Sequence, residues 1–350
     1  MDFKLTEDQE ELRKVARSFL EARCPSETVR RIEAEAAAGG PGHLPEIWAE
    51  MADMGWVGLA LPGGGGGPVE LAVIFEELGR AVCPTPLLST VVVGGLMLAD
   101  AGRLPDGVAE GETLIGTAII DTAADALEVT PSGSGVRVSG TAPFAYDVEG
   151  TDLLVVRAGA SVVLIPAEQP GISAIRLTPI SNDRLAELRP DGVDGEVIGD
   201  AETLVPPAIA RATAMRVAEV VGVMERAIEM ASEHARSRVQ FGQPLGAFQA
   251  VQHRLADMLI DVEGTRLVAN RAAWALEQDA TAERDVAVAK AWASDACQRV
   301  AFGAQQVHGG VGVDLDYDLQ LYFRRAKALE VELGSAPQQR GRLAGLIGLV

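Results

Sequence analysis

Apolar residues recur at helical spacing through both ends of the chain, whereas the middle alternates apolar and polar residues with a period of two. The first helical pattern contains Leu5, Leu12, Val15, Phe19 and Leu20. Thr6 followed by Gln9 predicts a capping box at the start of this helix. Further helices are predicted over residues 45–54, with Gly55 as the stop, and over residues 69–82. Residues 1–112 are therefore predicted to form an N-terminal helical domain.

The period changes to two between residues 113 and 202. The segments "TLIGTAIID", "TDLLVVRAG" and "ASVVLIPAE" are short, rich in Val, Ile and Leu, and separated by Gly, Pro and Asp. Such segments are typical of strands joined by tight turns. We predict a middle β domain here, either a small barrel or a sandwich.

The helical period returns from residue 203 and continues to residue 350. One apolar face is predicted to contain Met215, Ala218, Val221, Met224, Ile228, Ala231 and Ala235. Arg216, Glu219, Arg226, Glu229 and Glu233 are predicted to lie away from that face. Later helices are predicted over residues 248–278, 281–307 and 318–348. The predicted fold class is α+β, with a helical domain, a β domain and a C-terminal helical domain in that order.

Composition narrows the class of protein. The chain has 350 residues, with 50 acidic against 30 basic residues and a formal net charge of −20. This charge argues against nucleic-acid binding, which needs a basic surface. The most apolar window, residues 91–99, is too short to span a bilayer, and the acidic N-terminus does not resemble a signal peptide. We expect a soluble cytoplasmic protein without a membrane segment.

Few residues suggest metal or disulfide chemistry. The three cysteines, Cys24, Cys83 and Cys297, are widely scattered, and the four histidines share no metal-ligand spacing. The sequence has neither a dinucleotide-binding GxGxxG after a strand nor the GxSxG of serine hydrolases. We therefore predict no metal site.

The sequence "RSRVQFGQPLGAF" interrupts the long helical region after Arg236 and Arg238. Arginines at a helix C-terminus are favourable by themselves, because that end carries partial negative charge. Arg238 also stands beside the turn at Phe241 and Gly242, where an anion has room to approach. A second glycine-rich break, "QQVHGGVGV", follows a later helix. Turns of this kind gather at the ends of helical bundles, where ligands bind.

Three C-terminal segments resemble the signature of the acyl-CoA dehydrogenase family. They are "SRVQFGQPLGAFQAVQHRLADM", "AKAWASDACQRVAFGAQQVHGGVGV" and "RRAKALEVELGSAPQQR". The N-terminal segments "LTEDQEELRKVARSFLEA" and "IWAEMADMGWVGLALP" also resemble this family. The resemblance covers nearly the whole chain and implies an acyl-CoA dehydrogenase fold with a C-terminal four-helix bundle.

The resemblance implies FAD, bound noncovalently between the β domain and the bundle, and partly held by a neighbouring subunit. Arg238 would then contact the FAD pyrophosphate of the partner, and Phe241 would pack near its adenine or ribose. Gln306, Gly309 and Gly310 would meet the adenosine diphosphate part. In the β domain, a flavin-facing strand motif of the family reads "GTAPFAYDVEG", which places Phe144 and Tyr146 at its aromatic and hydroxyl positions.

The family desaturates acyl-CoA thioesters with a carboxylate base, and electrons pass to an electron-transfer flavoprotein. The two positions that usually carry the base read Ala212 and Leu333 in this chain. Glu219 is the nearest carboxylate on the first bundle helix, about 10 Å along the axis from Ala212. It is the candidate for a relocated base, and a solvated or interface glutamate is the alternative. The usual "TEPxxGSD" loop is also replaced, by "TAIIDTAAD" at residues 117–125.

The missing base resembles one chain type of heterotetrameric acyl-CoA dehydrogenases, in which one chain carries the base and the other completes the FAD site. Members of this type include enzymes that act on steroid side-chain CoA thioesters. Three hypotheses remain open from the sequence. The chain is one subunit of a tetrameric acyl-CoA dehydrogenase, or a homo-oligomeric oxidase or monooxygenase of the same fold, or a non-catalytic scaffold subunit.

Overall fold

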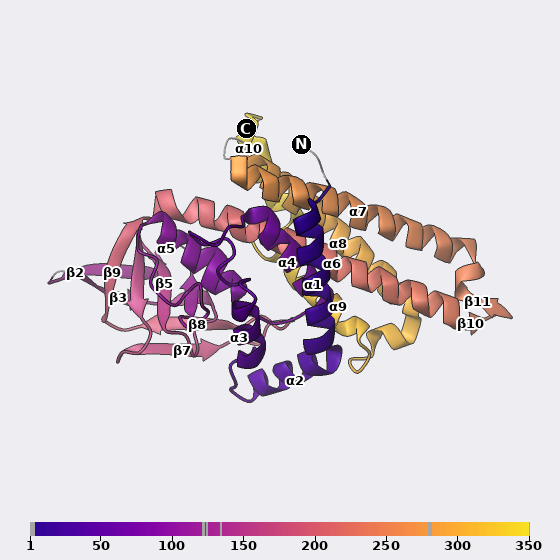
Figure 1. Ribbon diagram of the computed structural model, residues 1–350, viewed down its shortest axis with the longest axis horizontal. Coiled ribbons are helices and arrows are strands. Elements are labelled where there is room, and N and C mark those ends of the chain that lie inside the picture. The colour runs from indigo at the N-terminus through magenta and orange to yellow at the C-terminus, as the bar shows by residue number, and fades with distance from the viewer. Residues whose placement is uncertain (1–3, 121–122, 124, 134, 279–281, 350) are drawn as a thin grey trace. The chain divides into compact units, whose positions relative to one another are not determined.

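A computed structural model describes residues 4–120, 123, 125–133, 135–278 and 282–349 (Figure 1). The chain forms two compact units. The bundle unit consists of Met1–Arg30, Pro68–Cys83 and Thr213–Val350, and the sheet unit consists of Arg31–Gly67 and Pro84–Ala212. Each unit therefore combines segments that are far apart in the sequence.

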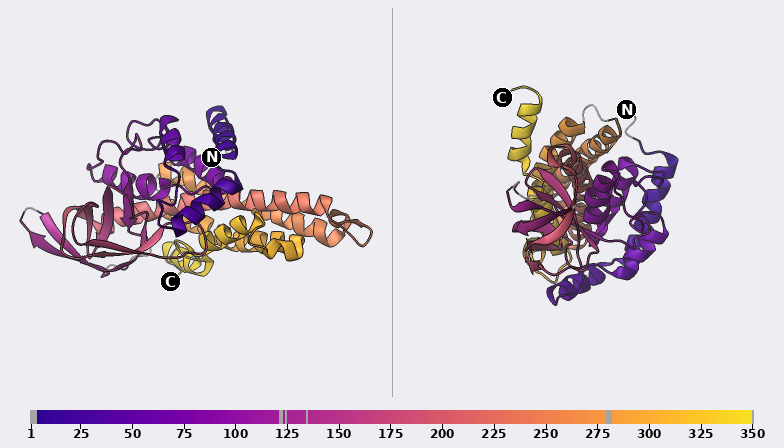
Figure 2. Two further views of the ribbon diagram at one scale, coloured as in Figure 1. Left: turned by 90° about the horizontal axis from the view of Figure 1, so that it is seen from below. Right: turned by 90° about the vertical axis from the view of Figure 1, so that its left-hand side faces the viewer.

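The sheet unit contains α3 (Pro45–Asp53), the π-helical η1 (Leu88–Gly95), α5 (Leu96–Asp100) and a curled nine-stranded sheet (Figure 2). Its strands are β1 (Ile115–Ala118), β2 (Leu127–Ser132), β3 (Gly135–Gly140), β4 (Ala142–Tyr146), β5 (Leu153–Ala158), β6 (Ser161–Pro166), β7 (Ile172–Arg176), β8 (Leu185–Pro190) and β9 (Val193–Asp200). The sheet confirms the β region predicted from the period of two.

The strand order is β2-β3-β9-β6-β5-β1-β4-β8-β7, and only the β1–β5 pair is parallel among the described strands. The central strands β5 and β6 are mostly buried, whereas β2 is largely exposed. Val156, Val163 and Ile165 belong to the apolar core of this sheet. A buried strand is a continuous apolar run, so the central segments read as Val- and Leu-rich in the sequence.

The apolar run over residues 91–99, too short for a bilayer, forms the second part of η1 and most of α5, and η1 is buried within the sheet unit. The Thr90 hydroxyl oxygen accepts the Ile115 amide at 3.2 Å, and the Ser89 hydroxyl donates to Asp147 at 2.5 Å. These bonds fix η1 to strand β1 and to the loop that follows β4. None of the helices in the described ranges is long and apolar enough to cross a membrane.

His43 is a buried histidine in the sheet unit, with only 6% of its surface exposed. Its Nδ1 atom has no hydrogen-bond partner within the part of the chain that the structure describes. Burial and the nearby Arg184 guanidinium lower the pKa of His43 from 6.5 to about 4. The imidazole is therefore neutral in the folded protein at neutral pH.

We expect this histidine to weaken folding as the pH falls from 6.5 to about 4. In that window the unfolded chain binds a proton at His43 and the folded chain does not, so stability present above pH 6.5 is lost on acidification. The loss approaches roughly 3 kcal/mol, at about 1.4 kcal/mol per pH unit. Urea unfolding of His43→Gln should show a shallower decline with acid than the parent chain. His253→Gln, at an exposed position on α7, is the matched control, and equal slopes for parent and His43→Gln would contradict the prediction.

The bundle unit contains α1 (Glu7–Arg23), α4 (Pro68–Ala81), α7 (Gln249–Gln278), α8 (Ala282–His308), α9 (Leu319–Val331) and α10 (Ala336–Leu346). Helices α2 (Ser26–Ala37) and α6 (Ala201–Ser237) each begin in one unit and end in the other. A hairpin of β10 (Val239–Gln240) and β11 (Gln243–Pro244) and the turn η2 (Leu245–Ala247) join α6 to α7, and η3 (Gly309–Val313) follows α8. The predicted capping box of Thr6 and Gln9 is confirmed at the start of α1.

Helices α4 and α6 cross with their backbones in contact. A Cβ atom on Gly79 would lie 2.1 Å from the Glu219 carbonyl oxygen, and one on Gly222 would lie 1.8 Å from the Glu76 carbonyl oxygen. Only glycine fits at these two positions. This close crossing places the charged side chains of α4 and α6 side by side.

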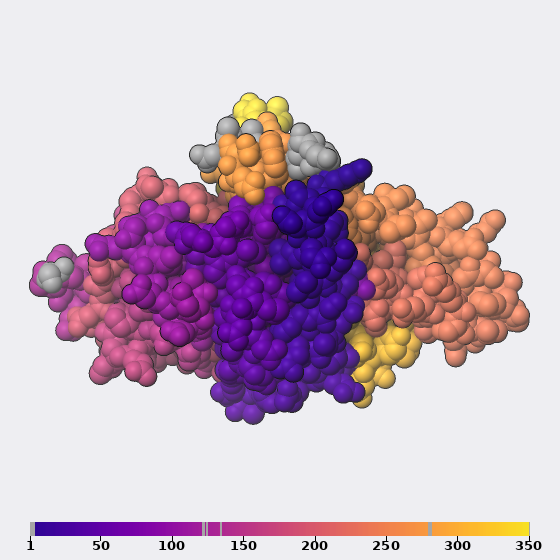
Figure 3. Space-filling model, in the orientation of Figure 1, coloured from indigo at the N-terminus to yellow at the C-terminus, as the bar shows by residue number. Residues whose placement is uncertain are grey.

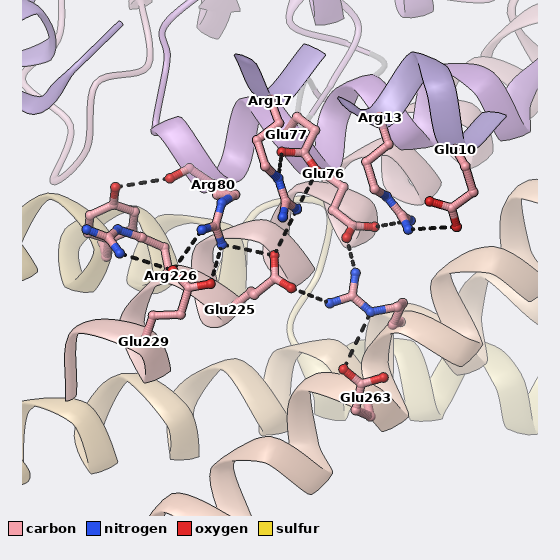
Figure 4. Close-up of polar contacts among 12 residues, drawn as sticks. Glu10, Arg13, Arg17, Glu76, Glu77, Arg80, Glu225, Arg226, Glu229 and Glu263 are labelled. Atoms are coloured by element: carbon pink, nitrogen blue, oxygen red, sulfur yellow. Dashed lines mark hydrogen bonds and ion pairs between the residues drawn. The ribbon is translucent and has the colours of Figure 1, made fainter. Parts of the chain in front are cut away.

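Those side chains form an ion-pair network with α1 and α7 (Figure 4). Arg17 donates to both oxygens of Glu77 at 2.9 and 2.8 Å, and Arg80 donates to both oxygens of Glu229 at 2.8 and 2.7 Å. Glu225 lies between them and also accepts Arg266 at 3.1 Å. The polar residues of α6 thus pack against neighbouring helices.

Two details of the predicted helices are wrong. The prediction that Arg216 and Glu219 lie away from the buried face fails, since both are at least 93% buried. Helix α6 is covered on all sides near these residues, so a single apolar stripe does not describe its surroundings. The predicted helix over residues 318–348 is instead two helices, because Leu333 and Gly334 adopt left-handed φ values of 59° and 93° and Ser335 starts α10 with a capping box.

Candidate cofactor site and base positions

The break in "RSRVQFGQPLGAF" is a two-residue hairpin that joins α6 to α7 (Figure 1). Phe241 and Gly242 occupy its tip with φ values of 54° and 81°, and Gln240 pairs with Gln243. Two left-handed residues in a two-residue loop suit the twist of a tight hairpin. The second position is glycine, but the first is a phenylalanine, for which this conformation is uncommon.

Phe241 is 91% exposed, and its ring meets only the edge of Phe248, at 6.1 Å between centroids, among the aromatic contacts of the described residues. A large apolar side chain at the tip of a hairpin is poorly covered by its own chain. The hairpin belongs to the end of the bundle unit that faces solvent in the space-filling view (Figure 3). This exposure favours contact with a molecule outside the chain.

Arg238 directly follows α6 and is exposed. Its backbone is fixed, because its amide donates to the His234 carbonyl and its carbonyl accepts the Leu245 amide, at 2.8 and 2.9 Å. Its guanidinium has no hydrogen bond or ion pair with any residue that the structure describes. The fork of five N–H donors is thus available to an external anion.

The two helix ends that precede the glycine-rich turns are in contact. His234 near the end of α6 stacks on His308 at the end of α8, with ring centroids 4.5 Å apart. The His308 Nδ1–H donates to the Ala304 carbonyl at 2.8 Å, and burial lowers the pKa of His308, which favours a neutral ring. The stack therefore joins the two helix ends that the sequence places more than 70 residues apart.

Gln306, Gly309 and Gly310 flank His308 in the sequence and are exposed. Gly309 has a left-handed φ of 65°, and a Cβ atom added to Gly309 or Gly310 would meet no heavy atom of the chain within 4 Å. A guanidinium, a carboxamide and an open glycine turn form a donor set that suits a polyanionic group such as a diphosphate. These residues fit the role that the resemblance implies for the pyrophosphate end of FAD.

Phe144 and Tyr146 lie on β4 in the sheet unit. Phe144 is 43% exposed, whereas Tyr146 is 6% exposed and pairs in register with Thr117 of β1 and Leu185 of β8. Of the replaced loop at residues 117–125, residues 121, 122 and 124 lie outside the described residues. The exposed ring of Phe144 is suited to cover a planar group, while the Tyr146 side chain is mostly enclosed by the sheet unit.

Neither usual base position carries an ionisable group. Ala212 is fully buried on α6, and Leu333 is 7% exposed in the link between α9 and α10. The Leu333 carbonyl accepts the Gln339 side-chain amide at 2.6 Å, which fixes the link. Lys290 fixes the preceding helix end, because its buried ammonium donates to the Leu329 and Glu330 carbonyls at 2.7 and 3.2 Å. The segment that usually presents the base is therefore ordered without a carboxylate at position 333.

Glu219, the candidate for a relocated base, is held by two arginines. Its carboxylate accepts Arg216 at 2.7 Å and Arg325 at 2.6 Å, and it is 5% exposed. Arg216 also pairs with Glu332 at 3.1 Å, beside Leu333. We call these four residues the buried charge cluster. It ties α6 to the end of α9, and a carboxylate held by two guanidiniums is a weak proton acceptor.

The sequence analysis did not identify the buried charge cluster. The i, i+3 spacing of Arg216 and Glu219 is visible in the sequence, but the same spacing is common on solvated helix surfaces. Arg325 and Glu332 come from another helix and from the link after it. Only the packing of α9 on α6 shows that the four charges neutralise one another.

Comparison with known proteins agrees with this architecture. Family models for the N-terminal and C-terminal domains of acyl-CoA dehydrogenases match residues 6–103 and 208–346. The chain belongs to the acyl-CoA dehydrogenase family. It is 32% identical to acyl-CoA dehydrogenase FadE27 of Mycobacterium tuberculosis, over 98% of each chain.

Two solved structures extend the comparison. A chain of the ChsE4–ChsE5 complex from Mycobacterium tuberculosis is 31% identical with a TM-score of 0.89, over 100% of each chain. A chain of the Tcur3481–Tcur3483 steroid ACAD, an engineered variant, is 32% identical with a TM-score of 0.88, over 98% of each chain. These TM-scores show that both chains share the fold of this chain.

Proposed function

We propose that this chain is the subunit of a hetero-oligomeric acyl-CoA dehydrogenase that completes an FAD site but lacks the catalytic base. The proposal rests on one combination in the sequence. The residues suited to a diphosphate, Arg238, Gln306, Gly309 and Gly310, are present, whereas Ala212 and Leu333 occupy the two base positions. The related ChsE4–ChsE5 and Tcur3481–Tcur3483 structures are complexes of two differently named chains. A second chain with a glutamate at a base position would supply the proton acceptor.

Bound FAD supplies the hydride acceptor for α,β-desaturation of an acyl-CoA thioester. This chain's contribution is binding and orientation. Arg238 would hold phosphate oxygens with its guanidinium fork, Gln306 would donate its amide, and the open turn at Gly309 and Gly310 would let backbone amides approach. Phe241 would cover the adenosine end. Electrons would leave to an electron-transfer flavoprotein.

The buried charge cluster supports a structural role for Glu219. A general base must reach the α-carbon of the substrate and have a pKa that suits proton removal. Glu219 instead shares both oxygens with Arg216 and Arg325. We therefore assign Glu219 to the fold of the bundle unit and leave proton removal to the partner chain.

The test is production of the chain alone and together with a related chain that carries the base. We expect the chain alone to lack flavin absorbance, and the joint product to be a yellow hetero-oligomer that reduces a dye with an acyl-CoA. Native mass spectrometry measures the composition, and the joint product with a partner lacking its glutamate is the control for activity. A chain that alone retains stoichiometric FAD and oxidises acyl-CoA would refute the proposal and favour a homo-oligomeric flavoenzyme. A joint product that never binds flavin would favour a scaffold subunit.

A further inference from the structure

Three aromatic rings meet where α6 and α8 end in the bundle unit. His308, the last residue of α8, stacks on His234 of α6, with ring centroids 4.5 Å apart and ring planes 30° apart. The ring of Tyr317, which lies between η3 and α9, is 5.3 Å from the His308 ring and tilted by 58°. We call these three residues the aromatic cluster. His308 is its centre, because its ring contacts both of the others.

The His308 ring is held without offering a hydrogen-bond donor. Its Nδ1–H donates to the Ala304 carbonyl at 2.8 Å, and a carbonyl only accepts, so the neutral ring has no proton on Nε2. The Nε2 atom is buried and has no hydrogen-bond partner in the part of the chain that the structure describes. The residue is only 5% exposed. Any effect of His308 on an external anion therefore passes through the residues that it contacts.

His308 also fixes the glycine turn that follows it. Gly309 is its direct neighbour in the chain, and a Cβ atom on Gly312 would lie 2.9 Å from the His308 Cβ atom, so η3 folds back against His308. The Gly312 carbonyl accepts the side-chain amides of Gln320 and, at 3.4 Å, of Gln305. The start of η3 thus follows the stacked histidine, and its end is anchored by two glutamines.

The other ring of the stack is coupled to Arg238. His234 precedes Arg238 by four residues, which is about 6 Å along a helix axis. The Arg238 amide donates to the His234 carbonyl at 2.8 Å, which continues the helical hydrogen-bond pattern as far as Arg238. A shift of His234 against His308 would therefore move Arg238 relative to the glycine turn. The stack sets the spacing between two segments that the proposed function assigns to one diphosphate.

Both rings of the stack are neutral at pH 7. Burial lowers the pKa of both histidines from 6.5, and the neighbouring His308 and Arg238 lower the pKa of His234 further. Two imidazolium rings with centroids 4.5 Å apart would repel each other. Neutral rings stack without this repulsion, and such pairs contribute free energy beyond the area that they bury. The stack is thus an attractive contact between α6 and α8.

We propose that His308 is a positioning residue for the diphosphate of FAD and that it acts through its stack on His234. The inference rests on the proposed function, because it concerns the same cofactor site. In the stacked arrangement the Arg238 backbone and the backbone amides of η3 are held at a fixed spacing before the cofactor arrives. Ordering donors during binding costs free energy, so donors that are already ordered bind more tightly. Loss of the stack should therefore weaken FAD binding without removing any group that contacts FAD.

The experiment measures the dissociation constant of FAD for the flavin-free hetero-oligomer of this chain and its base-carrying partner, by quenching of flavin fluorescence. His234 is half-buried, so substitutions there should fold. We expect His234→Leu, which removes the ring, to raise the dissociation constant about 3- to 10-fold, the range of a lost ring contact. His234→Tyr keeps a ring and should recover the affinity of the parent to within about twofold. His253→Leu, at an exposed position on α7, is the matched control and should leave the dissociation constant unchanged.

His308 itself is tested by a pair of variants. His308→Phe keeps a stacking ring and needs no hydrogen-bond partner, so we expect an FAD affinity close to that of the parent. His308→Ala removes the ring and should weaken binding as His234→Leu does. Thermal unfolding of the flavin-free hetero-oligomer accompanies each measurement. If His308→Ala does not fold, the two His234 variants decide the inference by themselves.

Outcomes against this inference differ from outcomes against the proposed function. Equal FAD affinity of His234→Leu and the parent would overturn the inference and leave the proposed function intact. Equal weakening by His234→Leu and His234→Tyr would also overturn it, because the ring would then not be the cause. A parent hetero-oligomer that binds no FAD would overturn the proposed function and the inference together.

Discussion

Replacing Arg238 by methionine should weaken FAD retention by the assembled oligomer about 10- to 100-fold. Methionine keeps an unbranched side chain but removes the guanidinium fork, and a hydrogen bond to a charged group contributes about 1.5–3 kcal/mol. The Arg238 guanidinium has no partner within the described part of its own chain, so folding should be unaffected. Equilibrium dialysis of FAD, with thermal unfolding alongside, measures both effects.

Arg236→Met is the matched control for this prediction. Arg236 is exposed on the last turn of the same helix and carries the same charge. It should change FAD affinity much less than Arg238→Met, because it lies within α6, whereas Arg238 lies between α6 and the hairpin. Arg238→Lys, which keeps the charge but loses the fork, should fall between the two. Equal FAD affinity of Arg238→Met and the parent chain would exclude Arg238 from the cofactor site.

Glu219→Gln should destabilise the chain by about 3–5 kcal/mol without removing a catalytic base. Glutamine is close in size to glutamate, but it leaves the buried Arg216 and Arg325 without the carboxylate that they share. One of the two negative charges of the buried charge cluster is then lost, while Arg216 keeps its pair with Glu332. Denaturant unfolding of the isolated chain measures the loss, and the pH dependence of turnover by the assembled enzyme should keep its shape.

Glu233→Gln is the control on the same helix. Glu233 is 66% exposed and pairs with Arg226 at 3.8 Å, so its loss should cost less than about 1 kcal/mol. If Glu219 is the catalytic base, the outcome is different. Glu219→Gln would then unfold at the same denaturant concentration as the parent chain, lower turnover by a factor of about 100 or more, and remove one limb of the pH profile of turnover.

Sequence motifs indicate the candidate cofactor residues but not the tertiary contacts around them. The helical pattern shows two glycine-rich breaks, and the resemblance to the acyl-CoA dehydrogenase family assigns Arg238, Phe241, Gln306, Gly309 and Gly310 to the cofactor there. The helix ends before these breaks meet through the stack of His234 on His308, and neither histidine is distinctive in the sequence. Contacts of this kind arise from packing and leave no periodic signal.

The sequence by itself determined the order of helices, sheet and helices, because that order is set by local periodicity and by local stop signals such as the Thr6 capping box. It also showed that Ala212 and Leu333 stand where the family usually has the base, because the residue type at a position is read from the sequence without a structure. The tertiary structure alone decided the environments of the charged residues. Arg216 and Glu219 have the spacing of an ordinary surface pair, yet α9 covers them and makes them a buried charge cluster. The helical period also does not show the break at Leu333. There a left-handed residue, whose carbonyl accepts the Gln339 side chain, outweighs local helix propensity. Periodicity describes one helix at a time, whereas burial depends on which helix packs against it.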